Sequence, residues 1–116
     1  MAAVPMTVVE TARFLKDAKP LMSDAERATL VEFVGADPTA GTVIPETGGV
    51  RKIRWALKGK GKRGGARVVY FYHSPHLPVF LLAAYAKNEK ATLSKSECNA
   101  IRRLVPILVA GYPGKR

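Results

Sequence analysis

With 116 residues, of which 47% are hydrophobic, the chain is long enough for one domain with one hydrophobic core, expected over residues 1–116. Its formal net charge of +10 indicates a polyanionic partner, and its single cysteine, Cys98, excludes an internal disulfide and a cysteine-rich zinc site. No run approaches the roughly 18 apolar residues that span a bilayer, and residues 1–10 lack a signal-peptide pattern, so we expect a cytoplasmic protein without membrane contact.

The first residues predict a short strand and a helix. Residues 6–10 are apolar and β-branched, as in a strand. Residues 11–18 have a helical composition, and the helix is expected to break at Lys19-Pro20 because proline disfavours helix in the residue before it.

A second helix and a long loop follow. Ser23 and Glu26 form the Ser-x-x-Glu pattern of a capping box, and apolar residues then recur at helical spacing until Gly35. Residues 36–49 are rich in Pro and Gly, which predicts a loop whose Thr-Gly-Gly end turns tightly into a strand.

Three consecutive strands are predicted in the middle of the chain. From Val50 to Lys58, apolar residues at 53, 55 and 57 alternate with cations at 52, 54 and 58, so that one face enters the core and the other offers positive charge. Residues 67–73 and 79–87 are the next two strands, and the last is apolar enough to be central. Their short connections predict an antiparallel meander with the helices on one face.

The last predicted element is a helix that starts with a second capping box, formed by Ser94 and Glu97. Apolar residues follow at helical spacing, but Pro106 interrupts them, so the helix is expected to stop near Leu104 or to kink there. The predicted fold class is α+β, with an antiparallel sheet, two N-terminal helices and one C-terminal helix.

Charge is unevenly distributed along the sequence. Residues 1–46 contain seven acidic and four basic side chains, whereas residues 47–116 contain two acidic and fifteen basic ones. A solvated face would normally interleave both signs, because unmixed positive charge repels itself. The stretch between Thr47 and Asn88 therefore predicts an anion-binding surface; it has no acidic residue and nine basic ones, namely Arg51, Lys52, Arg54, Lys58, Lys60, Lys62, Arg63, Arg67 and Lys87.

Other site chemistries are poorly supported. His73 and His76 flank a predicted turn, and no acidic residue lies within ten positions of either, so no metal or other cofactor is expected. The glycine-rich segment at 59–65 joins two strands and cannot present a helix N-terminus to a phosphate. What remains is a cluster of Lys and Arg that could converge on one phosphodiester.

Three sequence blocks resemble a known protein family. They are residues 46–56 (Glu-Thr-Gly-Gly-Val-Arg-Lys-Ile-Arg-Trp-Ala), 64–70 (Gly-Gly-Ala-Arg-Val-Val-Tyr) and 84–90 (Ala-Tyr-Ala-Lys-Asn-Glu-Lys). In this order and spacing they resemble the RelE/HigB superfamily of bacterial type II toxins, particularly its HigB-like, phage-derived branch. The resemblance covers most of residues 8–105 and implies a RelE-like, microbial-ribonuclease-like fold.

The resemblance also implies an activity, partners and site residues. Family members cleave mRNA in the ribosomal A site as endoribonucleases, for which we expect no metal, and an antitoxin, often a helix-turn-helix DNA-binding protein, blocks them. Asn88 departs from RelE proper, which has an arginine there, and the C-terminal tyrosine of RelE has no counterpart, since Ser94 falls near it. The catalytic residues expected by motif position are Lys52, Arg54, Arg67, Lys87 and Lys90, and those expected to bind RNA are Arg51, Lys58, Lys60, Lys62 and Arg63.

Two other functions are compatible with the same charges. One is a non-catalytic module that binds RNA or the ribosome, with Tyr70 or Tyr72 stacking on bases, although such aromatics are more often part of a core. The other is a ParE-like inhibitor of DNA gyrase. The paired cations on one strand favour the nuclease, because a gyrase inhibitor needs no cluster that cuts phosphodiesters.

Overall fold

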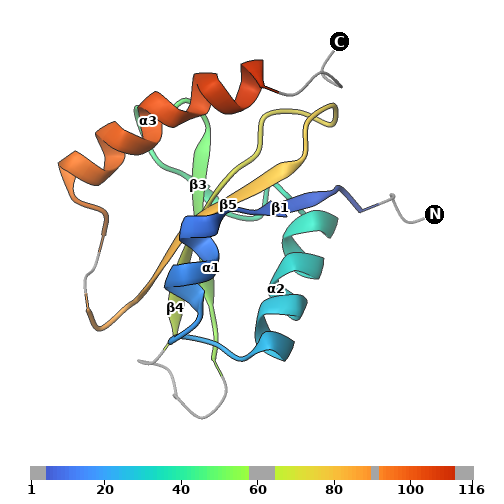
Figure 1. Cartoon of the computed structure of the whole chain (residues 1–116), viewed down its shortest axis with the longest axis vertical. Helices are drawn as coiled ribbons and strands as arrows, with labels where there is room; N and C mark the ends of the chain where they lie inside the picture. The colour runs from blue at the N-terminus through green and yellow to red at the C-terminus, as the bar shows by residue number, and fades with distance from the viewer. Residues whose placement is uncertain (1–4, 58–64, 90–91, 112–116) are drawn as a thin grey trace.

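Strands and helices follow the chain in the predicted order in the computed structural model, which describes residues 5–57, 65–89 and 92–111 (Figure 1). Both predicted capping boxes are present, at Ser23 and at Ser94. The elements are β1 (Val8–Glu10), α1 (Ala12–Ala18), α2 (Asp24–Ala36), β2 (Thr42–Val43), β3 (Val50–Trp55), β4 (Ala66–Phe71), β5 (Val79–Ala86) and α3 (Lys95–Ala110).

The strands form one sheet in the order β1-β5-β4-β3-β2. Strands β3, β4 and β5 pair antiparallel, as predicted, whereas β1 runs parallel to β5 at the edge. Strand β2 lies inside the predicted loop, and its two residues are too few to show a strand pattern in the sequence. The predicted α+β class, with two helices before the meander and one after it, is confirmed.

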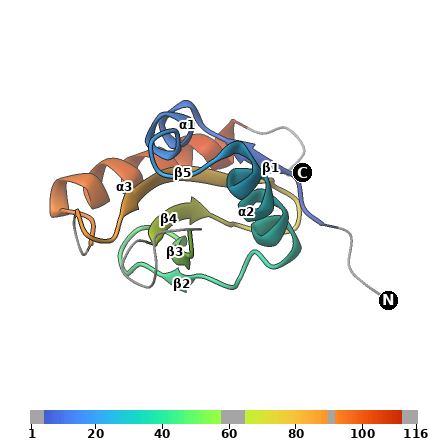
Figure 2. The ribbon, with the colours of Figure 1, turned by 90° about the horizontal axis from the view of Figure 1, so that it is seen from below.

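Helices cover both faces of the sheet, so the prediction that they share one face is wrong. Phe14 of α1 and Leu30 of α2 pack against one face, and Ile101 and Val105 of α3 pack against the other. Figure 2 shows α2 and α3 on opposite sides of the strands. The physical reason lies in β5, whose apolar side chains are buried on both faces of the sheet. Each face must therefore be shielded from water by helices.

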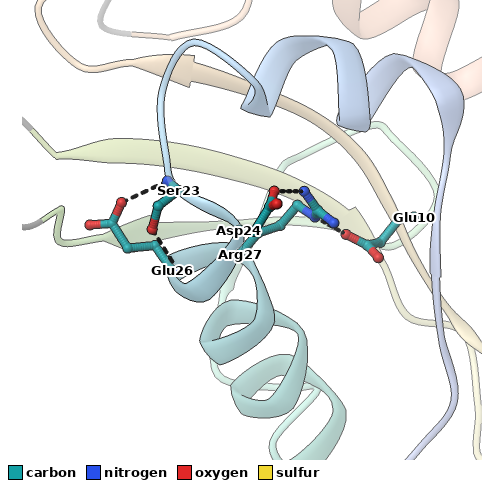
Figure 3. A network of polar contacts seen from close by, with 5 residues as sticks. All are labelled: Glu10, Ser23, Asp24, Glu26 and Arg27. Carbon is teal, nitrogen blue, oxygen red and sulfur yellow. Dashed lines mark hydrogen bonds and ion pairs between the residues drawn. The ribbon is translucent and has the colours of Figure 1, made fainter.

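Helix α2 is fastened to the sheet by an ion-pair network at its first turns (Figure 3). The Nε of Arg27 donates to the Glu10 carboxylate of β1 at 2.7 Å, and its Nη1 donates to Asp24 at 2.9 Å. Both carboxylates raise the pKa of Arg27, the Glu10 hydrogen bond most strongly. The acidic residues of the N-terminal region are thus partly used within the fold.

Helix α3 continues through Pro106 to Ala110, so it does not stop near Leu104. Pro106 lies on the exposed side, where the carbonyl that loses its partner can meet water, and Ile101 and Val105 hold the helix against the sheet. No helix in the described ranges is long and apolar enough to cross a membrane.

The Thr-Gly-Gly end of the loop before β3 is a structural turn. The buried Thr47 hydroxyl donates to the Ile44 carbonyl at 2.7 Å and accepts from the Val50 N–H at 3.2 Å. The two glycines at 48 and 49 have φ of 82° and 111°, a region that favours glycine. The first sequence block therefore contains residues that set the start of β3 as well as the cations that β3 carries.

Candidate nucleic-acid interface

Arginines face each other on the side of the sheet that α3 covers. Arg54 of β3 pairs in register with Arg67 of β4, and Arg67 pairs with Tyr85 of β5. Directly opposite residues of antiparallel strands point to the same face, with Cβ atoms about 4.5–5.5 Å apart. The structure therefore brings the two predicted arginines together in one row.

A second row on the same face contains Lys52, which pairs with Thr42 on one side and with Val69 on the other. Lys52 and Arg54 alternate with Ile53 and Trp55, which pack toward the opposite core as the sequence predicted. The two rows together place three predicted catalytic cations, Lys52, Arg54 and Arg67, on one face of the sheet.

These cations line a shallow, open hollow of about 330 Å³. One wall is the segment at residues 40–42, which precedes and enters β2. Arg54 is exposed, whereas Lys52 and Arg67 are half-buried. The hollow is lined by Ala40, Gly41, Thr42, Lys52, Ile53, Arg54 and Arg67.

Lys87 lies at the same end of the sheet. It follows β5, two residues beyond Tyr85, and its side chain is exposed. Its backbone N–H donates to the Gly65 carbonyl at 3.1 Å, which fixes it beside the start of β4. The other predicted cations at 58, 60, 62, 63 and 90, namely Lys58, Lys60, Lys62, Arg63 and Lys90, lie outside the described residues.

No carboxylate neutralises this cluster within the part of the chain that the structure describes. The ion pairs found there are those of Arg13 with Asp17 and Glu97, and of Arg27 with Glu10 and Asp24. Lys52, Arg54, Arg67 and Lys87 take part in none of them. An unneutralised row of guanidinium and ammonium groups is suited to bind phosphate oxygens.

Arg51, which the sequence predicts to bind RNA, is placed away from the cluster. It pairs in register with Tyr70, on the face opposite Lys52 and Arg54. Its Nη1 donates to the Gly41 carbonyl at 2.8 Å and to the Thr39 carbonyl at 3.2 Å. Strand alternation explains the difference, because neighbouring residues of β3 point to opposite faces.

Tyr85 lies in the same row as Arg54 and Arg67. The sequence pattern assigned Tyr85 only to an apolar strand. Its side chain is 6% exposed, and this burial raises the pKa of its hydroxyl, against the opposing effect of the Arg67 charge. Glu97 and Cys98 of α3 raise the same pKa. The phenol therefore stays neutral at physiological pH while it lies close to Arg67 and to the first turns of α3.

Tyr70 and Tyr72 differ from the stacking platforms considered in the sequence. Tyr70 has no exposed surface, and Tyr72 is half-buried against the core on the α1 and α2 face. Within the described ranges no group of three or more His, Cys, Asp or Glu side chains could hold a metal ion. The described side chains that line the hollow offer the charges of Lys52, Arg54 and Arg67 and the hydroxyl of Thr42.

A family model described as the RelE toxin of the RelE/RelB toxin-antitoxin system matches residues 6–111. The chain belongs to the RelE toxin family. The resemblance predicted from three sequence blocks is thereby confirmed at the level of RelE. Membership makes the chain the toxin of a toxin-antitoxin pair, with the endoribonuclease function and the antitoxin partner that the RelE family implies.

A solved relative has the same architecture. A free-state structure of a double arginine-to-alanine mutant of Escherichia coli toxin RelE superposes on this RelE-family chain with a TM-score of 0.57. The two are 19% identical, and the match covers 84% of this chain and 97% of the other. At this identity the superposition shows a shared fold. Which residues line the hollow follows from the geometry of this chain alone.

Proposed function

We propose that this RelE-family toxin cuts mRNA in the ribosomal A site without a metal ion, and that its cationic hollow binds the scissile phosphate. The observation that carries the proposal is the row in which Arg54 faces Arg67, with no carboxylate partner in the described residues. Lys52 lies in the adjacent row, Lys87 follows β5 two residues beyond Tyr85, and Lys90 follows in the sequence.

RNA supplies the nucleophile in this mechanism. The 2′-OH attacks the adjacent phosphorus in line, the bond from phosphorus to the 5′ oxygen breaks, and a 2′,3′-cyclic phosphate forms. Negative charge builds on the phosphoryl oxygens, where guanidinium groups bond two oxygens at once and keep their charge. Because Arg does not deprotonate, the 2′-OH proton is assigned to the neutral amine form of Lys52 or Lys87, and the departing 5′ oxygen takes a proton from water to become a 5′-OH.

Substrate positioning explains the need for a ribosome. The hollow offers electrostatic stabilisation, but the described residues that line it include no histidine or carboxylate for efficient proton transfer. Holding the mRNA in a reactive geometry can lower the barrier by as much as about 7–11 kcal/mol. We therefore propose that the toxin acts in the cytoplasm, on ribosome-bound mRNA, and that a helix-turn-helix antitoxin blocks it.

In vitro translation of a defined mRNA, followed by primer extension, tests this function. The expected result is a set of discrete 5′ ends at fixed positions within codons. Ribosome stalling without cuts would instead support a non-catalytic RNA-binding module, and an unaffected translation reaction would return the gyrase inhibitor as an alternative. The buried Tyr70 argues against the stacking that the binding module was expected to use.

The end groups of the fragments test the mechanism separately. Attack by the 2′-OH leaves a cyclic or 3′-phosphate upstream and a 5′-OH downstream, and a single 2′-deoxynucleotide at the cut site should block cleavage. A 5′-phosphate would point to an activated water and would contradict the metal-independent mechanism. Chelation is unsuitable here because ribosomes themselves need magnesium.

A further inference from the structure

Residues 38–41 lead into the wall of the hollow at residues 40–42, and side chains of the sheet hold them in place. These contacts, made by Tyr70 and Arg51, form a clamp. The Tyr70 hydroxyl accepts from the Gly41 N–H and donates to the Pro38 carbonyl, both at 2.8 Å. Arg51, its cross-strand neighbour, donates to the Gly41 carbonyl at 2.8 Å. Both polar groups of the Gly41 backbone are therefore held by side chains of the sheet.

The fit at Gly41 leaves no room for a side chain. A Cβ atom there would lie 2.8 Å from the Tyr70 hydroxyl and 2.9 Å from the Lys52 carbonyl oxygen. Real Cβ atoms essentially never approach other atoms this closely, so glycine permits the segment to pack directly against β3. The clamp thus fixes the backbone of the wall within van der Waals distance of the strand that carries the cations.

This wall adds a different kind of chemistry to the hollow. Thr42 follows Gly41 directly and pairs in register with Lys52, so its side chain points to the face of the cations. Among the described residues that line the hollow, Thr42 is the one with a side-chain hydroxyl. Cations that bind phosphate carry no sequence information, whereas single-stranded RNA is read by hydrogen bonds to base edges.

We propose that the side of the hollow formed by this wall is the subsite for the nucleoside next to the phosphate that the cations bind, and that Thr42 determines which base is accepted there. Tyr70 and Arg51 act as positioning residues, because they hold the wall through hydrogen bonds but do not line the hollow. The inference rests on the proposed function, since it concerns the substrate of the same site. In this proposal the cations carry out the chemistry of cleavage, and the neutral wall selects the cut site.

The test is the sequence preference of the cuts in a translation extract supplied with an mRNA that contains all codons. Thr42→Val keeps the shape and removes the hydroxyl, and we expect the preference between the best and the next codons to fall about 2- to 10-fold, the weight of one hydrogen bond. Thr39→Val is the matched control, because Thr39 lies in the same segment but does not line the hollow. Its cut-site distribution should equal that of the wild type.

Tyr70→Phe tests the positioning role separately. It removes the hydroxyl from the clamp, and the codon preference should change as in Thr42→Val, although Tyr70 has no exposed surface to meet RNA. Tyr72→Phe is the control for loss of a tyrosine hydroxyl, because Tyr72 follows the last residue of the same strand. Active Thr42→Val and Tyr70→Phe proteins with an unaltered cut-site distribution would overturn this inference and leave the proposed function standing. A folded wild-type protein that makes no cuts would overturn both.

Discussion

Arg54 and Arg67 lie directly opposite each other on neighbouring antiparallel strands. Like charges in this arrangement destabilise a sheet, by a few tenths of a kcal/mol up to about 1 kcal/mol. No carboxylate within the described residues relieves the repulsion. Two guanidinium groups that face each other without a carboxylate partner are suited to receive an anion between them.

Arg67→Ala should therefore abolish most of the cleavage without unfolding the protein. Loss of one group that stabilises the developing charge lowers the rate by about 100- to 1,000-fold. The midpoint of thermal unfolding should stay equal or rise, because the repulsion with Arg54 is removed. Cleavage in a translation extract and the unfolding midpoint are measured together, with Lys16→Ala as a control for loss of one exposed charge on α1. A folded Arg67→Ala protein that cuts at the wild-type rate would remove Arg67 from the site.

Much of the fold was predictable because its signals are local. Capping boxes at Ser23 and Ser94, and the apolar runs of β4 and β5, each depend on residues close together in the sequence. Strand alternation also separated Lys52 and Arg54 from Trp55 correctly. Local patterns therefore sufficed for the order of the elements other than β2, and for the face that Lys52 and Arg54 take.

The remainder depends on contacts between distant residues. Strand β2 exists because Thr42 pairs with Lys52 of β3, and no pattern in the sequence around Thr42 predicts that pairing. Arg51 belongs to the same charge run as its neighbours, but only Tyr70 and the Gly41 carbonyl show that it serves the clamp. Charge counting identifies cations and cannot tell which face each one takes.

Trp55→Ala should destabilise the protein moderately and leave RNA binding unchanged. The ring lies on the face opposite Arg54, with its centroid 5.5 Å from that of Phe33. Because Trp55 is only half-buried, the loss should be about 2 kcal/mol, below the roughly 3–5 kcal/mol of a fully buried ring. Urea unfolding measures it, and Ile107→Ala, at a side chain that is 66% exposed, is the control that should change little. A stable variant that fails only in RNA binding would show that the ring stacks on a base.

The clamp predicts a loss of stability at alkaline pH. Burial raises the pKa of Tyr70 above its ordinary value of 10.0, although the Gly41 N–H and the Arg51 charge oppose this shift. A raised pKa means that the fold favours the protonated hydroxyl, so its contribution is complete below pH 10.0 and is lost as pH rises through the folded-state pKa.

Tyr70→Phe has no such proton to lose. Its free energy of unfolding should be lower than that of the wild type at neutral pH, and the difference should shrink above pH 10.0. Tyr85→Phe is a useful comparison, because burial raises the pKa of Tyr85 in the same direction. Urea unfolding across a pH series gives both curves, and a difference that stays constant with pH would contradict the assignment.

The salt dependence of RNA binding can distinguish residues on the two faces of β3. Binding to single-stranded RNA weakens with salt concentration in proportion to the phosphates that the protein neutralises, with a slope of about −0.7 per phosphate in log–log form. Arg54 is exposed in the cationic row, so Arg54→Gln should lower the magnitude of the slope by about 0.7. Arg51 is engaged with the Thr39 and Gly41 carbonyls on the other face, so Arg51→Gln should leave the slope unchanged, provided that circular dichroism shows a native fold. Fluorescence anisotropy of a labelled RNA over a salt series measures both, and an equal drop in the two variants would place Arg51 among the phosphate contacts after all.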